Sequence, residues 1–278
     1  MIDLHTHSTA SDGTDSPAAL ARAARAAGLG AIALTDHNNV DALPEFLTES
    51  GKIGLTAVAG VEFSTEWRGT ELHLLGLFLD EASFPAICGA MESLRRSKEQ
   101  SNRELAERLC AAGYDVPYDE AAALAGGNYV NRAHFATLLA RKGYVPDRTA
   151  AFRRLLDEGR GFYFPAPRPQ TIDMIAFTRS LHAVPVLAHP YLNLSQEQLL
   201  ELLPAACEAG LAGMEAFYSE YSRETTALAL ETAVRHNLVP SGGSDYHGGN
   251  KPYIRLGIGR GDLFTPDWVL PALLAQKN

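Results

Sequence analysis

The chain has 278 residues, of which 46% are hydrophobic and 21% charged, and its formal net charge is −9. This composition is ordinary for a soluble globular enzyme, and the length suits one barrel-sized domain with an insertion. The net negative charge argues against a general nucleic-acid binder held by an overall positive field. No apolar stretch approaches the ~20 residues of a membrane helix, and the first residues lack the basic start and apolar core of a signal peptide.

The three cysteines, Cys88, Cys110 and Cys207, are widely spaced in Ala-rich helical contexts. They fit neither a disulfide framework nor a thiolate metal motif, so we expect a cytoplasmic protein in a reducing compartment. The charge is uneven, because residues 91–170 carry 13 Lys+Arg and 10 Asp+Glu, against 11 and 23 in the rest. A mildly basic segment suits a small anionic substrate, although solvated helix faces explain it equally well.

The first predicted element places two imidazoles on one side of a strand. The chain begins Met1-Ile-Asp3-Leu-His5-Thr-His7, and alternate side chains of a strand point the same way. Two ring nitrogens on one side form half of a metal site. By itself, an H-x-H pair is as readily two satisfied histidines.

Six further segments repeat one pattern, in which an apolar run carries metal-capable side chains, usually where it stops. The segments are residues 30–37, 55–62, 71–78, 184–190, 211–217 and 238–247, and the side chains are Asp36, His37, Glu62, His73, His189, Glu215, Asp245 and His247. Val-, Leu-, Ile- and Ala-rich runs of this length are typical of strands covered on both faces.

Helical stretches separate these runs. One begins at Ser16-Pro17 and ends at Gly28, and the others cover residues 171–182, 195–209 and 222–237. Alternation of strand and helix predicts a parallel α/β fold, and polar residues at carboxyl ends of strands are typical of the active-site face of a β/α barrel. With seven countable strands, we expect a distorted seven-stranded β/α barrel that is not fully closed.

The strand–helix rhythm stops after residue 80 and resumes near residue 171. Helical patterns cover residues 84–113, 118–124, 131–142 and 147–158, and Pro165, Pro167 and Pro169 form a stiff connector. We therefore expect a barrel made of residues 1–83 and 170–278, with a helical insertion, residues 84–169, over the active site.

The predicted strand ends supply many metal donors without sulfur. The candidate ligands are His5, His7, Asp12, His37, Glu62, His73, His189, Asp245 and His247. Nitrogen and oxygen donors in this number suit two or three Mn, Fe or Zn ions, and fit neither Ca nor an all-oxygen Mg cage. Asp12 lies between Ser11 and Gly13, where a turn role is an equal alternative. His182 and His236 end helices that lead into strands, so we expect them on the opposite rim, without a metal role.

These motifs resemble the polymerase and histidinol phosphatase (PHP) family of the amidohydrolase superfamily. The matching residues are Asp3-Leu-His5-Thr-His7-Ser8, Thr35-Asp36-His37, Gly60-Val-Glu62, His73, His189-Pro190 and Ser244-Asp245-Tyr-His247. The resemblance implies a distorted seven-stranded barrel and a metal-dependent phosphoesterase holding two or three divalent ions, with Mn expected first and Zn or Fe as alternatives.

The resemblance also implies how the ligands are shared among three ions. His5, His7, Glu62 and Asp245 would hold one ion, and Glu62, His73 and His189 a second. Asp12, His37 and His247 would hold a third. Asp12, His37, Asp245 and His247 are also the expected catalytic residues, and the sequence does not choose between Asp245 and His247 as the proton carrier.

The segment Asn131-Arg132-Ala-His134 resembles one branch of the family, which dephosphorylates nucleoside 3′,5′-bisphosphates and trims short RNA from the 5′ end. It implies removal of the 3′-phosphate by a metal-bound hydroxide, which gives a nucleoside 5′-monophosphate. The expected substrate contacts are Asn131, Arg132, His134, Asn102, Arg103, Asp12 and His247. Tyr129, Phe162 and Tyr163 are candidates for base stacking, although plain packing is favoured.

Four other activities stay open at this point: a 5′–3′ exonuclease on short RNA, a histidinol-phosphate-type phosphatase, a C–N hydrolase of the wider superfamily and a non-enzymatic nucleotide sensor. No strand-end lysine suggests the bridging carbamate of the C–N hydrolases. A sensor has no need of a complete ligand set. The sequence reveals no membrane segment and no obligate protein partner, and it leaves the native ion, base preference and oligomeric state open.

Overall fold

The computed structural model describes residues 1–126 and 130–277, so Tyr129 lies outside the described residues. The chain divides into two compact units. The first, called here the barrel unit, comprises Met1–Cys88 and Arg168–Asn278, and the second, the helical unit, comprises Gly89–Pro167. Within the described residues, no helix is both long and apolar enough to cross a bilayer.

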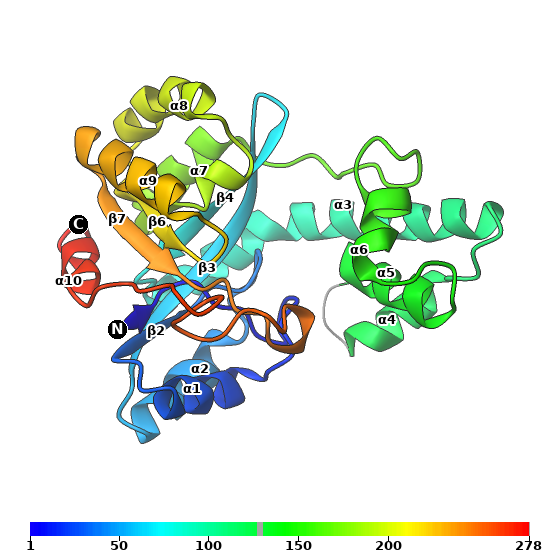
Figure 1. The fold of residues 1–278 in the computed structure, drawn as a ribbon, viewed down its shortest axis with the longest axis horizontal. Coiled ribbons are helices and arrows are strands. Elements are labelled where there is room, and N and C mark those ends of the chain that lie inside the picture. Colours follow the sequence, from blue (N-terminus) through cyan, green and yellow to red (C-terminus); the bar gives the residue numbers. More distant parts are fainter. Residues whose placement is uncertain (127–129, 278) are drawn as a thin grey trace. The chain divides into compact units, whose positions relative to one another are not determined.

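The barrel unit contains a single seven-stranded sheet whose spatial order follows the chain order (Figure 1). The strands are β1 (Ile2–Asp3), β2 (Ala31–Leu34), β3 (Thr56–Trp67), β4 (Thr70–Leu77), β5 (Val184–Ala188), β6 (Gly213–Tyr218) and β7 (Val239–Gly243). The sheet nearly closes, because Leu4 N donates to Gly242 O at 3.2 Å and Asp245 N donates to His5 O at 2.8 Å. The prediction of a distorted seven-stranded α/β barrel is confirmed.

The expectation that all strands run parallel is wrong for β4. This strand pairs antiparallel with both β3 and β5, whereas the other neighbouring strands pair in parallel. Only Arg68 and Gly69 separate β3 from β4, and both have positive φ, as a two-residue hairpin turn requires. A hairpin reverses the chain, so β4 presents His73 from within the strand, opposite Ala188 at the end of β5.

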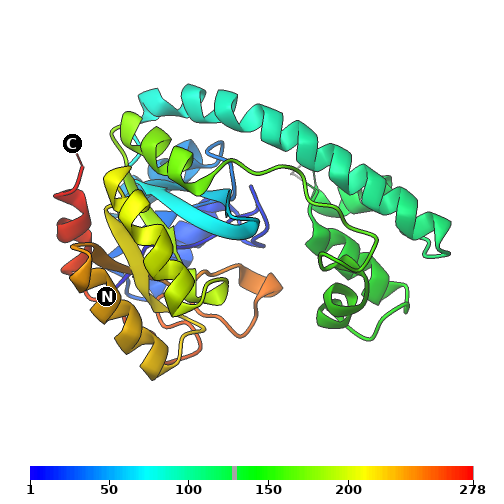
Figure 2. The ribbon, with the colours of Figure 1, turned by 90° about the horizontal axis from the view of Figure 1, so that it is seen from above.

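Helices cover the outside of these strands, as Figure 2 shows for the barrel unit. They are α1 (Pro17–Ala26), α2 (Leu43–Lys52), α7 (Thr171–Ser180), α8 (Gln196–Glu208), α9 (Arg223–Arg235) and α10 (Val269–Leu274). The helices predicted to begin at Ser16, at residue 195 and at residue 222 are α1, α8 and α9, and Ser16, Ser195 and Ser222 each cap one of them by accepting a first-turn N–H. Two further helices, α2 and α10, were not predicted, and neither begins with a capping side chain.

Closure of the barrel depends on glycine at the end of β7. A Cβ atom built on Gly243 would lie 2.4 Å from the backbone N and the Cβ of His5. Only a residue without a side chain therefore lets β7 approach the segment after β1 that carries His5 and His7. The prediction that these two histidines lie within the first strand is wrong, because β1 ends at Asp3.

The helical unit contains most of α3 (Phe84–Ala111), followed by α4 (Tyr118–Ala125), α5 (Arg132–Arg141), α6 (Arg148–Ala151) and a π-helical turn at Phe152–Leu156. These helices enclose their own apolar core, in which Leu105, Leu109, Phe135, Leu139 and Leu156 are fully buried. Tyr163 is buried in the same core and Phe162 packs against it, which agrees with packing rather than base stacking for these two rings.

Candidate metal centre

Glu62 lies at the middle of a group of imidazole rings in the barrel unit. Its Oε1 atom lies 2.8 Å from His73 Nδ1, 3.2 Å from His189 Nε2 and 3.3 Å from His5 Nε2. Its Oε2 atom lies 3.1 Å from His37 Nδ1 and 3.2 Å from His7 Nε2. The carboxylate is almost completely buried, and each of its oxygens faces a different set of rings. It could therefore bind two neighbouring ions at once.

Asp245 faces the same centre from the loop after β7. Its Oδ1 atom lies 3.2 Å from His7 Nε2 and 3.7 Å from His5 Nε2. Its Oδ2 atom accepts from the Tyr218 hydroxyl at 2.8 Å and the Lys251 ammonium at 2.6 Å. Both donors bind the same oxygen, so Oδ1 is turned toward the histidines.

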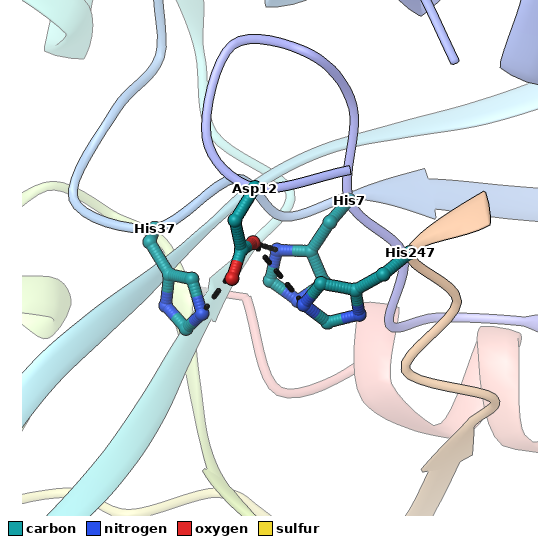
Figure 3. A group of neighbouring side chains, drawn as sticks. All are labelled: His7, Asp12, His37 and His247. Carbon is teal, nitrogen blue, oxygen red and sulfur yellow. Dashed lines mark ion pairs between the residues drawn. The ribbon is translucent and has the colours of Figure 1, made fainter. Parts of the chain in front are cut away.

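Asp12 gathers a third set of side chains, drawn in Figure 3. Its Oδ1 atom lies 3.1 Å from His247 Nε2, 3.8 Å from His7 Nδ1 and 3.9 Å from His37 Nε2. The loop after β1 turns this carboxylate back between the rings, as a metal ligand at this position would need.

Two further buried carboxylates fix the loops that carry these ligands. Asp36 accepts from the Ser8 N–H and hydroxyl at 2.8 and 2.7 Å, and from the Ser11 hydroxyl at 2.5 Å. Asp3 accepts from the Ser244 N–H at 2.7 Å and the Ser244 hydroxyl at 2.6 Å. The loop bearing His7 and Asp12, and the one bearing Asp245, are thus tied to neighbouring strands.

The donor atoms fit divalent ions. Among the residues that the structure describes, four groups of three or four side chains have ligand atoms within 4.8 Å of one another: His7, Asp12, His37 and His247; His5, His189 and Glu215; His5, His7 and Asp245; and His37, Glu62 and His73. Five buried atoms of these residues have no hydrogen-bond partner within the described part of the chain: His5 Nε2, His7 Nε2, His37 Nδ1, Glu62 Oε2 and His73 Nδ1. Buried polar atoms are normally satisfied, so these orphaned atoms point to bound ions.

The pKa values of these side chains agree with a group of metal ligands. Burial lowers the pKa of His7 and His73, but neighbouring carboxylates outweigh it and raise the two values to about 9 and about 10. Burial lowers the pKa of His37 to about 3. Burial raises the pKa of Glu62, yet the surrounding imidazoles hold it well below its usual range. A divalent ion would replace the protons that the imidazoles otherwise hold.

The structure therefore brings all nine predicted ligands together in the barrel unit. His182 and His236 instead follow the last turns of α7 and α9, before β5 and β7, and belong to none of the donor groups. Glu215, a metal-capable side chain outside the predicted ligand set, lies beside His5 and His189. Tyr218 and Lys251 were missed, and no sequence signal marks either as a partner of Asp245.

The predicted substrate contacts of the helical unit have structural roles there. Asn131 caps α5 by accepting from Ala133 N at 3.0 Å, and His134 Nδ1 accepts from Asn131 N at 3.1 Å. The Arg132 guanidinium donates to Leu156 O at 3.3 Å and stacks on the Tyr163 ring, 4.3 Å from its centroid. The motif that carried the family-branch resemblance is also a helix start.

Two residues of α3 behave similarly. The buried Asn102 amide donates to Val130 O at 2.7 Å, and Arg103 pairs with Glu99 at 2.7 Å while stacking on Tyr118. Arg103 is about half exposed (48%), so part of its side chain is accessible to solvent.

Comparisons with known proteins agree with this geometry. The PHP domain model matches residues 3–163. A 5′–3′ exoribonuclease of Escherichia coli is 35% identical, with 92% of this chain and 88% of that protein covered. A 3′,5′-nucleoside bisphosphate phosphatase of Chromobacterium violaceum is 31% identical, with 88% and 87% covered.

Among solved structures, a protein of Bifidobacterium adolescentis assigned as a metal-dependent phosphoesterase superposes with a TM-score of 0.88. It is 28% identical, and the match covers 100% of this chain and 96% of that one. The family model and the full-length relatives show that this chain belongs to the PHP family.

Proposed function

We propose that this chain is a metal-dependent phosphoesterase that removes the 3′-phosphate from nucleoside 3′,5′-bisphosphates, giving nucleoside 5′-monophosphate and phosphate. The observation that carries the proposal is the convergence of five imidazoles on Glu62, with orphaned buried donor atoms among them. Asp12, Asp245 and His247 complete the group of nine side chains through contacts with these rings and with one another. We propose two or three ions, with manganese first and zinc or iron as alternatives, since imidazole and carboxylate donors suit all three.

The proposed ligand sets are those implied by the family resemblance, and contacts within the centre support them. His5, His7 and Asp245 share the first position with Glu62, and His73 and His189 share the second with its Oε1 atom. Asp12, His37 and His247 form the third. Divalent ions bound there would activate water and offset the charge that develops on the phosphoryl oxygens.

The proton for the departing 3′-oxygen has two candidate carriers on this chain. His247 Nδ1 lies 2.8 Å from the Asp245 carbonyl oxygen, which can only accept, so Nδ1 carries the hydrogen and Nε2 faces Asp12. Asp245 Oδ1 lies 3.4 Å from the same Nδ1 atom. We propose that these two residues, with Asp12 and His37 beside them, handle the proton and orient the phosphate.

We also propose that Asn131, Arg132 and His134, with Asn102 and Arg103, contact the sugar or the second phosphate. Arginine supports this assignment because its planar guanidinium can bind two phosphate oxygens. The capping box of Asn131 and His134 holds both side chains in defined conformations, which favours specific recognition.

A 5′–3′ exonuclease on short RNA is the second candidate, because the exoribonuclease and phosphatase relatives are similarly distant. Both reactions break the bond between a 3′-oxygen and phosphorus beside a 5′-phosphate. They differ in whether the phosphorus carries another nucleotide, so one centre suits both.

The test is a kinetic comparison on protein loaded with manganese or zinc. Phosphate release from a 3′,5′-bisphosphate is compared with mononucleotide release from 5′-phosphorylated tri- to pentanucleotides, and with hydrolysis of histidinol phosphate and of a cyclic phosphodiester. We expect the highest kcat/KM for the bisphosphate. A higher value for the oligonucleotides would assign the chain to the exonuclease function, and protein that binds no ion would overturn both.

A further inference from the structure

A fully buried carboxylate on β6 contacts two of the predicted ligands without belonging to any family motif found in the sequence. Glu215 Oε1 lies 3.1 Å from His5 Nδ1, and its Oε2 accepts from the backbone N–H of His189 at 2.8 Å. The side chain of Glu215 is 0% exposed. The proposed function assigns no role to this residue.

Glu215 belongs to one of the four donor groups, but its contacts favour a role behind the ligands rather than as a ligand itself. One of its oxygens faces the His5 ring and the other accepts from the His189 backbone. The opposite ring nitrogen, His5 Nε2, has no hydrogen-bond partner in the described residues and faces Glu62 Oε1 and Asp245 Oδ1. The carboxylate therefore stands behind the imidazole, on the side away from the ion position.

We infer that Glu215 is a positioning residue that keeps the hydrogen of His5 on Nδ1 and so leaves Nε2 to bind an ion. A carboxylate behind a metal-binding histidine generally fixes its tautomer and ring orientation. The inference rests on the metal centre of the proposed function. It adds a residue that acts on the ligands rather than on the substrate.

The second oxygen of Glu215 extends this role to the neighbouring ion position. His189 has a φ of 28°, a backbone conformation that side chains rarely adopt. Its N–H bond to Glu215 Oε2 helps to hold that conformation, from which His189 Nε2 reaches Glu62 Oε1 at 3.2 Å. One carboxylate thereby positions ligands of two adjacent ions.

The substitution Glu215→Gln separates the two contacts because an amide has only one accepting oxygen. The His189 N–H can only donate, so it takes that oxygen, and the amide NH₂ must then face His5. An NH₂ group can only donate, which moves the ring hydrogen of His5 to Nε2, where it blocks ion binding. We expect Glu215→Gln to lose one ion, the one shared by His5, His7 and Asp245.

Thr65→Val provides the control. Thr65 is another fully buried polar residue of the barrel unit, and its hydroxyl hydrogen-bonds with Leu72 O and with Thr171 Oγ1, each at 2.8 Å. It lies on β3, as Glu62 does, but alternation along the strand points its side chain to the opposite face of the sheet. We expect this variant to unfold at a lower temperature than the wild type and to keep its ions.

The experiment measures zinc stoichiometry and affinity on the full chain by calorimetry and elemental analysis, together with thermal unfolding. In Glu215→Gln we expect one zinc ion fewer, or ~10–100-fold weaker binding at one position, with the wild-type number in Thr65→Val. Equal zinc content in wild type and Glu215→Gln, or equal loss in both variants, would overturn the inference. A wild-type protein without zinc would instead overturn the proposed function.

A second measurement does not depend on the variant folding. Ring ¹⁵N resonances of the histidines in zinc-loaded wild-type protein report which nitrogen of His5 carries hydrogen. We expect hydrogen on Nδ1 and zinc on Nε2, and the reverse arrangement would refute the positioning role.

Discussion

The barrel unit and the helical unit use the same kinds of polar side chain in opposite ways. In the barrel unit, His5, His7 and Glu62 are buried with donor atoms that have no hydrogen-bond partner in the described chain. In the helical unit, Asn131 and His134 satisfy each other as a capping box, beside an apolar core. The difference shows that histidine content alone does not mark a metal centre, whereas buried and unsatisfied imidazole nitrogens do.

The largest expected effect is that of Glu62→Gln, which tests the barrel side of this comparison. The amide keeps the size of the side chain but removes the negative charge between five imidazoles, so the ions lose their shared ligand. Loss of several kcal/mol of charge stabilisation corresponds to a decrease in kcat/KM of ~10³-fold or more. Phosphate-release assays and elemental analysis measure it, and a variant with full metal content and near-normal turnover would contradict the bridging role.

Gly243→Ala is expected to have the next largest effect, through packing rather than charge. The added methyl group would meet His5 at 2.4 Å, so the end of β7 must move away from the segment that follows β1. Overpacking of this kind costs roughly 1–3 kcal/mol, and we expect a lower Tm together with weaker metal binding. The matched control is Gly51→Ala, where a Cβ meets nothing within 4 Å. Similar unfolding curves for Gly243→Ala and wild type would refute the proposed close approach.

Much of this comparison follows from the sequence, and the rest has identifiable causes. The seven runs and all nine candidate ligands could be found because buried strands are apolar and the polar residues at their ends stand out. The antiparallel direction of β4 was not predicted, because an apolar run looks the same whichever way the strand runs. The direction is set by the hairpin turn before it, which is only two residues long, Arg68-Gly69. Glu215 was visible as a polar residue, but its orientation behind His5 depends on the pairing of distant strands.

The helical unit illustrates the other limit. Asn131, Arg132 and His134 were identified through a short motif, and the same residues begin α5, cap it and stack on Tyr163. A sequence motif cannot separate a capping role from substrate binding, because both use the same side-chain types at the same spacing. The buried contact of Asn102 with Val130 O was equally invisible before the chain was folded.

His134→Ala separates these two roles and is expected to have a moderate effect. Loss of a phosphate or sugar contact should raise KM for a bisphosphate by ~10-fold, which corresponds to one hydrogen bond to a charged group. Metal content should not change, because His134 belongs to none of the donor groups. His134→Gln is the control, since glutamine at this position can keep the capping box. Loss of metal in His134→Ala would mean that His134 is a ligand. If His134→Ala is less stable than the wild type but has an unchanged KM, capping of α5 is the only role of His134.

The smallest effect is expected for His182→Ala and His236→Ala, which test whether position on the barrel separates ligand histidines from structural ones. Both residues follow a helix and precede a strand, at the ends of α7 and α9, and neither contributes to a donor group. A histidine there interacts with the helix dipole, typically by 0.3–1 kcal/mol, so Tm should fall slightly while kcat/KM stays within about twofold of wild type. His182 has a φ of 56°, so His182→Asn, which tolerates that conformation better than alanine, serves as the control for backbone strain. A hundredfold loss of turnover in a folded variant at either position would mean that the rim of the barrel opposite the metal centre takes part in catalysis.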